Sequence, residues 1–388
     1  MQSVEGPGGS IIFENVFALG SIVVGQTPPV ADLTLTWAPL RRARTGDDIG
    51  LFDALTWRHR LTETLVGRDA EMTALLDWAE DGLGGISVRL MSGPAGAGKT
   101  RLAAEAATAL KTRQWTAGFL PQSQDHAELV RATGRGLFMI LDYPEERRPL
   151  VDRLLDGISD RPGDPERPVR ILLVSRRSAR SWGTMAARLG HLFSRQEIAT
   201  PDALSAEAAL EVLTEAAVRF AALTDATIPD LAAAPAWLGA DSVRRRPLYA
   251  AASGVRAVAT ESPAFDYGAA DLMRWLAERE LLRVRRISTV VGLEETELER
   301  LLAMALFVPQ GLGRAEIREL AALELSETSA TALASAVAKT PWWLPLANGG
   351  PPRLARLEPD QPAAAFLEAA LLADPDPLLP RWMAVPAT

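Results

Sequence analysis

Gly93-Pro-Ala-Gly-Ala-Gly-Lys-Thr100 stands between an apolar segment, residues 86–92, and an alanine-rich segment that extends to Thr112. The octapeptide matches the pattern G-x-x-x-x-G-K-[ST], in which glycines let successive backbone N–H groups point at an anion. Its flanks predict a buried strand before the loop and a helix after it, which is the context that this mechanism requires. We therefore expect a phosphate-binding loop that takes a nucleoside triphosphate or its diphosphate.

Each position of the loop has an expected role. Lys99 would reach the β- and γ-phosphates, and the Thr100 hydroxyl would hold Mg²⁺. The N-terminus of the following helix would add partial positive charge. The residues expected to bind nucleotide through this motif are Gly93, Pro94, Ala95, Gly96, Ala97, Gly98, Lys99, Thr100 and Arg101.

A carboxylate follows a second apolar segment, Leu137-Phe-Met-Ile-Leu-Asp142. Ligands bind at the carboxyl ends of parallel strands, so Asp142 is expected to act with Thr100 in holding Mg²⁺. Without the phosphate-binding loop earlier in the chain, an Asp at this position would be explained equally well as a turn residue. Glu145 stands where a base polarising the attacking water should sit, although acids also favour the first turn of a helix.

Basic residues follow two later segments. Arg176 comes directly after the apolar strand predicted at 169–175 and could sense the γ-phosphate, or could only solvate the end of the strand. Pro247, in Arg244-Arg-Arg-Pro247, could belong to a lid over the base or simply open a helix. The candidate catalytic residues are Lys99, Asp142, Glu145 and Arg176.

The composition narrows the class of protein. A chain of 388 residues can form two to four domains, and it contains no cysteine, which excludes thiol catalysis and thiolate metal sites. Its formal net charge of −8 argues against nucleic acid as the main partner. Apolar stretches are too short to span a bilayer, and the first residues lack the basic region of a signal peptide. A cytoplasmic location is the expectation.

Predicted strands and helices alternate in the first half of the chain. Such a pattern favours parallel strands joined by crossover helices, and the near-continuous apolar strands indicate a sheet covered on both faces. The strands are expected at 86–92, 115–120, 137–142 and 169–175, with helices at 99–112, 124–133, 146–158 and 178–190.

Beyond residue 200 the pattern predicts helices alone, at 204–223, 242–258, 269–286 and 294–305. The expected fold is α/β, a P-loop NTPase parallel sheet with flanking helices, followed by an all-α helical region and a winged-helix-like domain. Residues 1–60 contain two short candidate strands between 11 and 25, and nothing in them indicates chemistry. The expected units are 1–60, 61–200 (nucleotide-binding), 201–284 (helical lid) and 285–388 (winged-helix-like).

In order along the chain, these features resemble the STAND class of signal-transducing P-loop ATPases, which includes NB-ARC and NACHT proteins. The resemblance covers roughly residues 60–370. The matching segments are Val66-Gly-Arg-Asp-Ala-Glu71, Gly93–Thr100, Leu141-Asp-Tyr-Pro-Glu145, Leu173-Val-Ser-Arg176 and Arg246-Pro-Leu248.

The resemblance implies an ATP- and ADP-dependent switch that hydrolyses ATP slowly and self-associates when activated, with an unknown protein partner or sensor. It also implies that Val66, Arg68 and Pro247 contact the nucleotide. Two departures concern the ADP-bound state. The histidine that reads the ADP phosphate in the family is absent from Leu357-Glu-Pro-Asp360, where it would fall, and Arg246 replaces the usual small residue before the proline.

Two other functions remain open from the sequence. One is an AAA+-like ATPase that acts on DNA through the winged helix, supported by the basic residues Arg279, Arg283, Arg285 and Arg286, which could equally be a solvated helix face. The other is a scaffold that binds nucleotide without turnover, because the catalytic base is uncertain.

Overall fold

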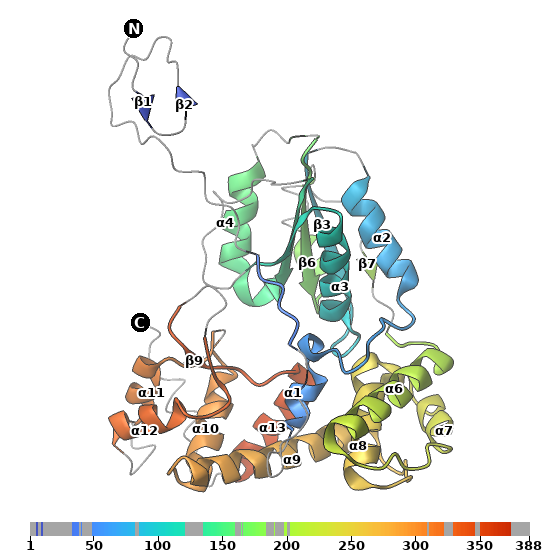
Figure 1. Ribbon diagram of the computed structural model, residues 1–388, viewed down its shortest axis with the longest axis vertical. Helices are drawn as coiled ribbons and strands as arrows, with labels where there is room; N and C mark the ends of the chain where they lie inside the picture. Colours follow the sequence, from blue (N-terminus) through green and yellow to red (C-terminus); the bar gives the residue numbers. More distant parts are fainter. Residues whose placement is uncertain are drawn as a thin grey trace.

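The computed structural model describes most of the chain from residue 33 to residue 373. The described residues are 5–6, 9–10, 33–38, 40, 49–81, 85–120, 135–159, 164, 166–183, 190, 198–199, 202–308, 310–321, 329–345 and 350–373. Two units are visible in Figure 1: a layered α/β unit and, below it in that view, a larger helical assembly, which contains α1 and the helices that follow the sheet. Among the described residues no helix is long and apolar enough to cross a membrane.

A parallel five-stranded sheet forms the centre of the α/β unit. Its order is β4-β5-β6-β3-β7, so the strand before the phosphate-binding loop, β3, is separated from the strand that ends in Asp142, β5, by the later strand β6. The strands are β3 (Ile86–Ser92), β4 (Thr116–Phe119), β5 (Leu137–Asp142), β6 (Val169–Ser175) and β7 (Ile198–Ala199).

Helices cover both faces of the sheet, which explains why β5 and β6 are apolar apart from Arg170 and the polar residues at their ends, Asp142 and Ser175. Leu137, Met139 and Leu141 pack with α4 (Arg148–Ser159), whereas Phe138 and Ile140 pack on the opposite side with α2 (Asp69–Glu80) and α3 (Lys99–Thr112). Figure 1 shows α4 on one side of the strands and α2 and α3 on the other. Successive side chains of a strand point to opposite faces, so both sets must be apolar.

A segment before the sheet lies along its edge. Thr34 exchanges two backbone hydrogen bonds with Phe119 of β4, at 2.9 and 2.8 Å, and so pairs with the outermost strand in the antiparallel sense. The Trp37 indole N–H donates to the Thr108 hydroxyl of α3 at 3.2 Å. Two short helices, α1 (Leu51–Leu55) and η1 (Trp57–His59), follow this segment and precede α2.

The helical assembly has one continuous apolar core that extends from α1 to α13. The expected boundary at 284/285 falls inside the 22-residue helix α9, which spans both parts. A short antiparallel hairpin, β8–β9, follows α10, α11 and α12, in the manner of a winged-helix-like unit. The elements are α6 (Ala206–Thr224), α7 (Ala234–Gly239), η5 (Val243–Arg245), α8 (Pro247–Thr260), α9 (Ala269–Val290), α10 (Glu295–Ala305), α11 (Arg314–Leu320), α12 (Ala330–Val337), β8 (Trp343–Leu344), β9 (Arg353–Leu354) and α13 (Asp360–Ala373).

The expected elements and the observed ones agree closely where both can be compared. The predicted helix at 146–158 begins as a 3₁₀ turn, η3 (Pro144–Arg147), and continues as α4. Within 178–190 the structure describes η4 (Ala179–Trp182) and one α-helical residue, Gly183, and residues 184–189 lie outside the described part; β7 is an additional strand. The predicted strands at 11–25 and the helix at 124–133 lie outside the described residues.

Candidate nucleotide site

The phosphate-binding loop connects β3 to α3 and requires glycine at two positions. Gly96 and Gly98 have φ angles of +79° and +86°, a region that side-chain-bearing residues rarely adopt. At Gly96 a Cβ atom would also lie 3.3 Å from the Cβ of Leu248, at the start of α8. The loop is therefore tightly wound and directly covered by the helical assembly.

Lys99 points back onto its own loop. Its ammonium group donates to the carbonyl oxygens of Gly93 and Pro94, both at 2.8 Å. Burial lowers the pKa of Lys99 to about 8, an effect that the nearby Asp142 carboxylate partly opposes. These carbonyl contacts keep the charge at the mouth of the loop, where a bound phosphate would compete for it.

The Thr100 hydroxyl and the Asp142 carboxylate meet at the end of the sheet, with 3.1 Å between Oγ1 and Oδ2. Burial raises the pKa of Asp142 to about 7, while the hydrogen bond from Thr100 acts in the opposite direction. One hydroxyl and one carboxylate suit Mg²⁺, which usually takes few protein ligands and fills its octahedron with water and phosphate oxygens. These residues therefore fit the expected ion.

Arg176, at the end of β6, is surrounded by carboxylates. Its side chain contacts Glu146 at 3.1 Å, Asp360 at 3.4 Å and Glu145 at 3.8 Å. Glu145 accepts the backbone N–H of Arg176 at 3.1 Å through Oε1, and its buried Oε2 has no hydrogen-bond partner. Arg176 lines the pocket and Glu145 does not. Glu145 therefore lies beside the end of β6 but does not face the pocket.

The segment Val66–Glu71, which we call the entry segment, and the start of α8 lie on two sides of the loop. Arg68 donates to the carbonyl of Ala97 at 3.1 Å, and Val66 lines the pocket. The Leu248 N–H donates to the carbonyl of Gly96 at 3.2 Å, and the Pro247 ring would lie 3.4 Å from a Cβ at Gly98. All three predicted contact residues, Val66, Arg68 and Pro247, thus lie at the loop.

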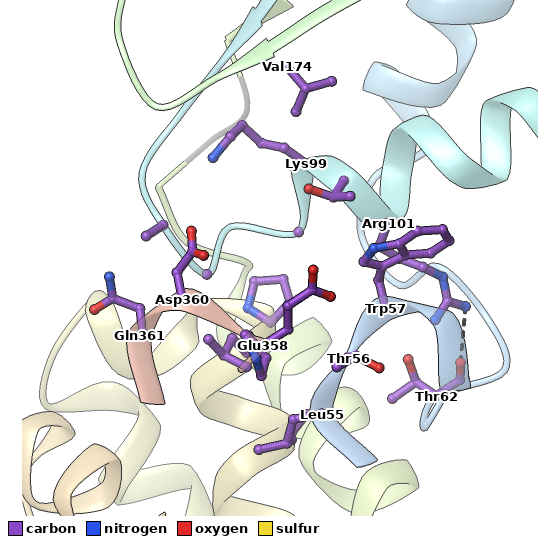
Figure 2. A pocket seen from close by; sticks show the side chains of 18 of the residues that line it. Leu55, Thr56, Trp57, Thr62, Lys99, Arg101, Val174, Glu358, Asp360 and Gln361 are labelled. Carbon is purple, nitrogen blue, oxygen red and sulfur yellow. Dashed lines mark hydrogen bonds between the residues drawn. The ribbon is translucent and has the colours of Figure 1, made fainter. Parts of the chain in front are cut away.

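Residues 55–57 form part of the pocket wall, although nothing in the sequence before residue 60 indicated chemistry. Leu55, Thr56 and Trp57 line the pocket together with the loop. The sequence signal was missed because α1 is only five residues long and precedes the recognisable entry segment. Arg101 reaches this wall by donating to the Thr62 carbonyl at 3.1 Å, the dashed line in Figure 2.

Residues 356–361, before and at the start of α13, form another side of the pocket region. The Tyr143 hydroxyl donates to Asp360 at 2.8 Å, and Arg356 pairs with Glu146 at 2.9 Å. Tyr249 of α8 donates to Gln361 at 3.2 Å. In Figure 2 the carboxylates of Glu358 and Asp360 point towards the loop from the side opposite Lys99. We refer to residues 357–361 as the acidic cover.

These walls enclose one pocket of about 1350 Å³ of empty space, counting its open mouth. Its polar end holds Lys99, Thr100 and Asp142, and its apolar side includes Leu61, Val212 and other aliphatic residues from the helical assembly. Such an arrangement accommodates a ligand with an anionic end and a larger, less polar end, as a nucleotide has.

Two of the four arginines of the predicted basic cluster on α9 are engaged within the molecule, whereas Arg279 and Arg286 are exposed. Arg283 contacts Glu280 at 2.8 Å and Asp53 at 3.3 Å, and it lies over the ring of Trp342. Arg285 pairs with Glu299 at 2.8 Å. These two side chains therefore neutralise acidic groups of the helical assembly rather than forming an open basic surface.

Comparisons with known proteins do not assign a family. No protein-family model matches the chain, and no curated protein sequence matches it. Solved structures that are similar include the Walker-type ATPase paby2304 of Pyrococcus abyssi, with 14% identity over 79% of this chain and 97% of that one and a TM-score of 0.35.

Two further solved structures have similar values. The Aeropyrum pernix ORC1 protein, in complex with DNA, has 16% identity over 83% of this chain and 96% of that one, with a TM-score of 0.39. NtrX from Brucella abortus, in complex with ADP, has 16% identity over 64% of this chain and 69% of that one, with a TM-score of 0.36. The P-loop fold of this chain rests on its own loop, strand order and helices.

Proposed function

We propose that this protein is a nucleotide-dependent switch that binds ADP or ATP with Mg²⁺ and hydrolyses ATP slowly. The observation that carries this proposal is the enclosure of a complete phosphate-binding loop by both later parts of the chain. Leu248 of α8 contacts Gly96 of the loop, and Asp360 of α13 contacts Tyr143 directly after β5. A ligand in this pocket would touch every unit at once, so it can bias their arrangement.

Slow hydrolysis agrees with the chemistry around Asp142. The residue after it is Tyr143, which cannot act as a base because burial and neighbouring carboxylates raise the pKa of its hydroxyl far above its usual range. Glu145 is the best candidate to polarise water, through its unpartnered oxygen, but in this arrangement it is hydrogen-bonded to Arg176. A rearrangement of the strand end would have to precede efficient turnover.

We assign the switch to the STAND type on the order of its motifs, with self-association on activation as the expected output. The DNA-directed ATPase is less favoured, since Arg283 and Arg285 are engaged in ion pairs with the protein's own acids. Thr34 pairs with β4 at the edge of the sheet, and a partner bound at that edge would respond to a change in the α/β unit.

Denaturing the purified protein and identifying the released nucleotide tests binding. We expect ADP at close to one equivalent, and we expect the Lys99→Ala variant to release none. Steady-state turnover should be below about 1 s⁻¹, at the slow end of enzyme rates. If the protein neither carries nor takes up ADP or ATP with Mg²⁺, the proposal is wrong.

A further inference from the structure

We propose that Arg246, immediately before α8, is a positioning residue that fixes the phosphate-binding loop in its anion-binding shape and acts on the ligand only through the loop. The inference rests on the proposed nucleotide site and gives the helical assembly a part in binding the phosphates. Arg246 is also one of the two positions at which the sequence departs from the STAND pattern, which has a small residue there. The role is therefore not part of that resemblance.

Five successive carbonyl oxygens of the loop, those of residues 93–97, accept hydrogen bonds. Lys99 donates to the first two. The other three accept from elements outside the loop: Ala95 from the Arg246 guanidinium at 3.4 Å, Gly96 from the Leu248 N–H at 3.2 Å, and Ala97 from Arg68 at 3.1 Å. Two of these three donors stand at the start of α8, so the helical assembly holds the middle of the loop.

A bonded carbonyl also fixes the direction of the next N–H. The peptide group is planar and trans, so its C=O and its N–H point in opposite directions. The bond from Arg246 to the Ala95 carbonyl therefore turns the N–H of Gly96 away from the arginine. A loop of this kind binds phosphate through its N–H groups, so donors on the carbonyl side keep those groups presented to the ligand. Gly96 has a φ of +79° and no side chain, so its backbone is the part of the loop that most needs such a restraint.

The Arg246 side chain is held between two backbone carbonyls. Its Nη1 donates to Ala95, and its Nε donates at 3.3 Å to Asp202, in the segment that precedes α6. Bonds from a charged donor are stronger than those between neutral groups. Arg246 does not line the pocket, whereas Pro247 and Leu248 do. Its hydrogen bonds thus reach a bound ligand only through the loop.

Loss of this bond has to be separated from a general loosening of α8. Pro247 and Leu248 line the pocket, so a displaced α8 should weaken the binding of a nucleoside and of a nucleotide alike. Loss of the Arg246 bond alone should weaken the binding of the phosphates and leave the nucleoside unaffected. Arg244 provides the comparison, because it stands two positions earlier and donates at 3.2 Å to the Trp237 carbonyl, inside the helical assembly.

The test measures the affinity for MgADP by isothermal titration calorimetry and the affinity for adenosine by ligand-observed NMR. Arg246→Gln has a shorter, uncharged side chain that cannot bond to both carbonyls. We expect it to weaken MgADP binding about tenfold, at the lower end of what a hydrogen bond to a charged group contributes. Its affinity for adenosine should stay within about twofold of the original.

Two further variants accompany it. Arg246→Lys keeps a charged donor at this position and should restore most of the affinity for MgADP. Arg244→Gln removes a neighbouring arginine that bonds within the helical assembly, and it should leave the ratio of the two affinities within about twofold of the original.

The outcomes separate this inference from the proposed function. If Arg246→Gln binds MgADP normally, or loses affinity for adenosine equally, the positioning role is overturned and the nucleotide site stands. The same conclusion follows if Arg244→Gln changes the ratio as much as Arg246→Gln does. If the original protein binds neither MgADP nor MgATP, the proposed function fails first, and the inference falls with it.

Discussion

The phosphate-binding loop and the acidic cover face each other across one pocket, but they are built in different ways. The loop consists of consecutive residues, and its lysine even bonds to carbonyls only five and six positions away. The cover is held by contacts between groups that are far apart, such as Tyr143 and Asp360, 217 residues distant in sequence. The loop is thus held by local contacts, whereas the cover depends on contacts between distant parts of the folded chain.

The largest expected effect concerns the loop. Lys99→Ala should weaken ADP binding by about a hundredfold, because more than one charge-assisted hydrogen bond to phosphate is lost, each contributing about 1.5–3 kcal/mol. When both proteins are stripped of nucleotide, thermal unfolding should change little, since the buried Lys99 charge is costly in the empty protein. Calorimetric titration and a melting curve measure both quantities.

Lys111→Ala, at the exposed end of the same helix, is the matched control and should bind ADP normally. If Lys99→Ala also separated the acidic cover from the α/β unit, the loop and the cover would not be structurally independent.

A second prediction concerns the stability of the helical assembly, remote from the loop. Glu280 is 1% exposed, and burial raises its pKa to about 7 even though Arg283, 2.8 Å away, acts in the opposite direction. In the unfolded chain its pKa returns to about 4.5. The folded state then holds more protons between these values, so its stabilising contribution is complete below pH 4.5 and is lost as the pH rises to 7.

We expect Glu280 to lower the free energy of unfolding by on the order of 2 kcal/mol between pH 4.5 and 7.5. Glu280→Gln should remove this part of the pH dependence, while keeping an oxygen for Arg283. Urea denaturation at the two pH values measures it, with Glu278→Gln on the exposed face of α9 as control. An unchanged pH dependence in Glu280→Gln would show that the carboxyl titrates normally in the folded protein.

Gly96→Ala examines the place where the loop and the helical assembly touch. A methyl group there would be strained by the φ of +79° and would press on Leu248. Backbone strain of this kind costs roughly 1–2 kcal/mol, so nucleotide affinity should fall by about tenfold. The binding assay used for Lys99→Ala applies unchanged.

Gly292 provides the matching control, because its φ is +82° and no atom lies within 4 Å of its added Cβ. Gly292→Ala should destabilise the protein by a similar amount while its folded form binds nucleotide normally. Equal losses of affinity in the two variants would mean that strain alone, and not the contact with α8, matters.

The smallest expected effect concerns the cover. Tyr143→Phe removes the hydrogen bond to Asp360, which should contribute about 1 kcal/mol at this partly exposed position. The fraction of molecules in which the acidic cover has separated from the α/β unit should therefore increase about fivefold. The rate of limited proteolysis measures that population where opening is fast. Tyr267→Phe, which removes a hydrogen bond to Ser253 inside the helical core, should not change this rate. Equal rates for the original protein and Tyr143→Phe would show that the cover is held by other contacts.

The sequence predicted the α/β unit well because its signals are local. The strand–loop–helix around Gly93–Thr100, the apolar strand ending in Asp142 and the strand before Arg176 each follow from short stretches of residue types. Their convergence also follows, because the carboxyl ends of parallel strands meet at one edge of a sheet. The roles of Lys99, Thr100, Asp142, Glu145 and Arg176 in chemistry remain predictions.

Other parts of the pocket could not be derived from the sequence. A five-residue helix such as α1 has no period to detect, and Trp57 reaches the pocket only because α1 packs into the helical core. The sequence likewise showed that Leu357–Asp360 lacks a histidine, but not that Asp360 faces Arg176.

What the sequence determined by itself is the phosphate-binding loop, since glycines at fixed spacing, a lysine and a threonine define an anion site through backbone geometry within one turn. What only the tertiary structure decided is which residues of α8 and α13 lie over this loop. The contact between Asp360 and Arg176 depends on how α13 packs against α9 and on the order of strands that puts β6 beside β5. Such a contact arises from the packing of many weakly interacting side chains, and no short segment of sequence encodes it.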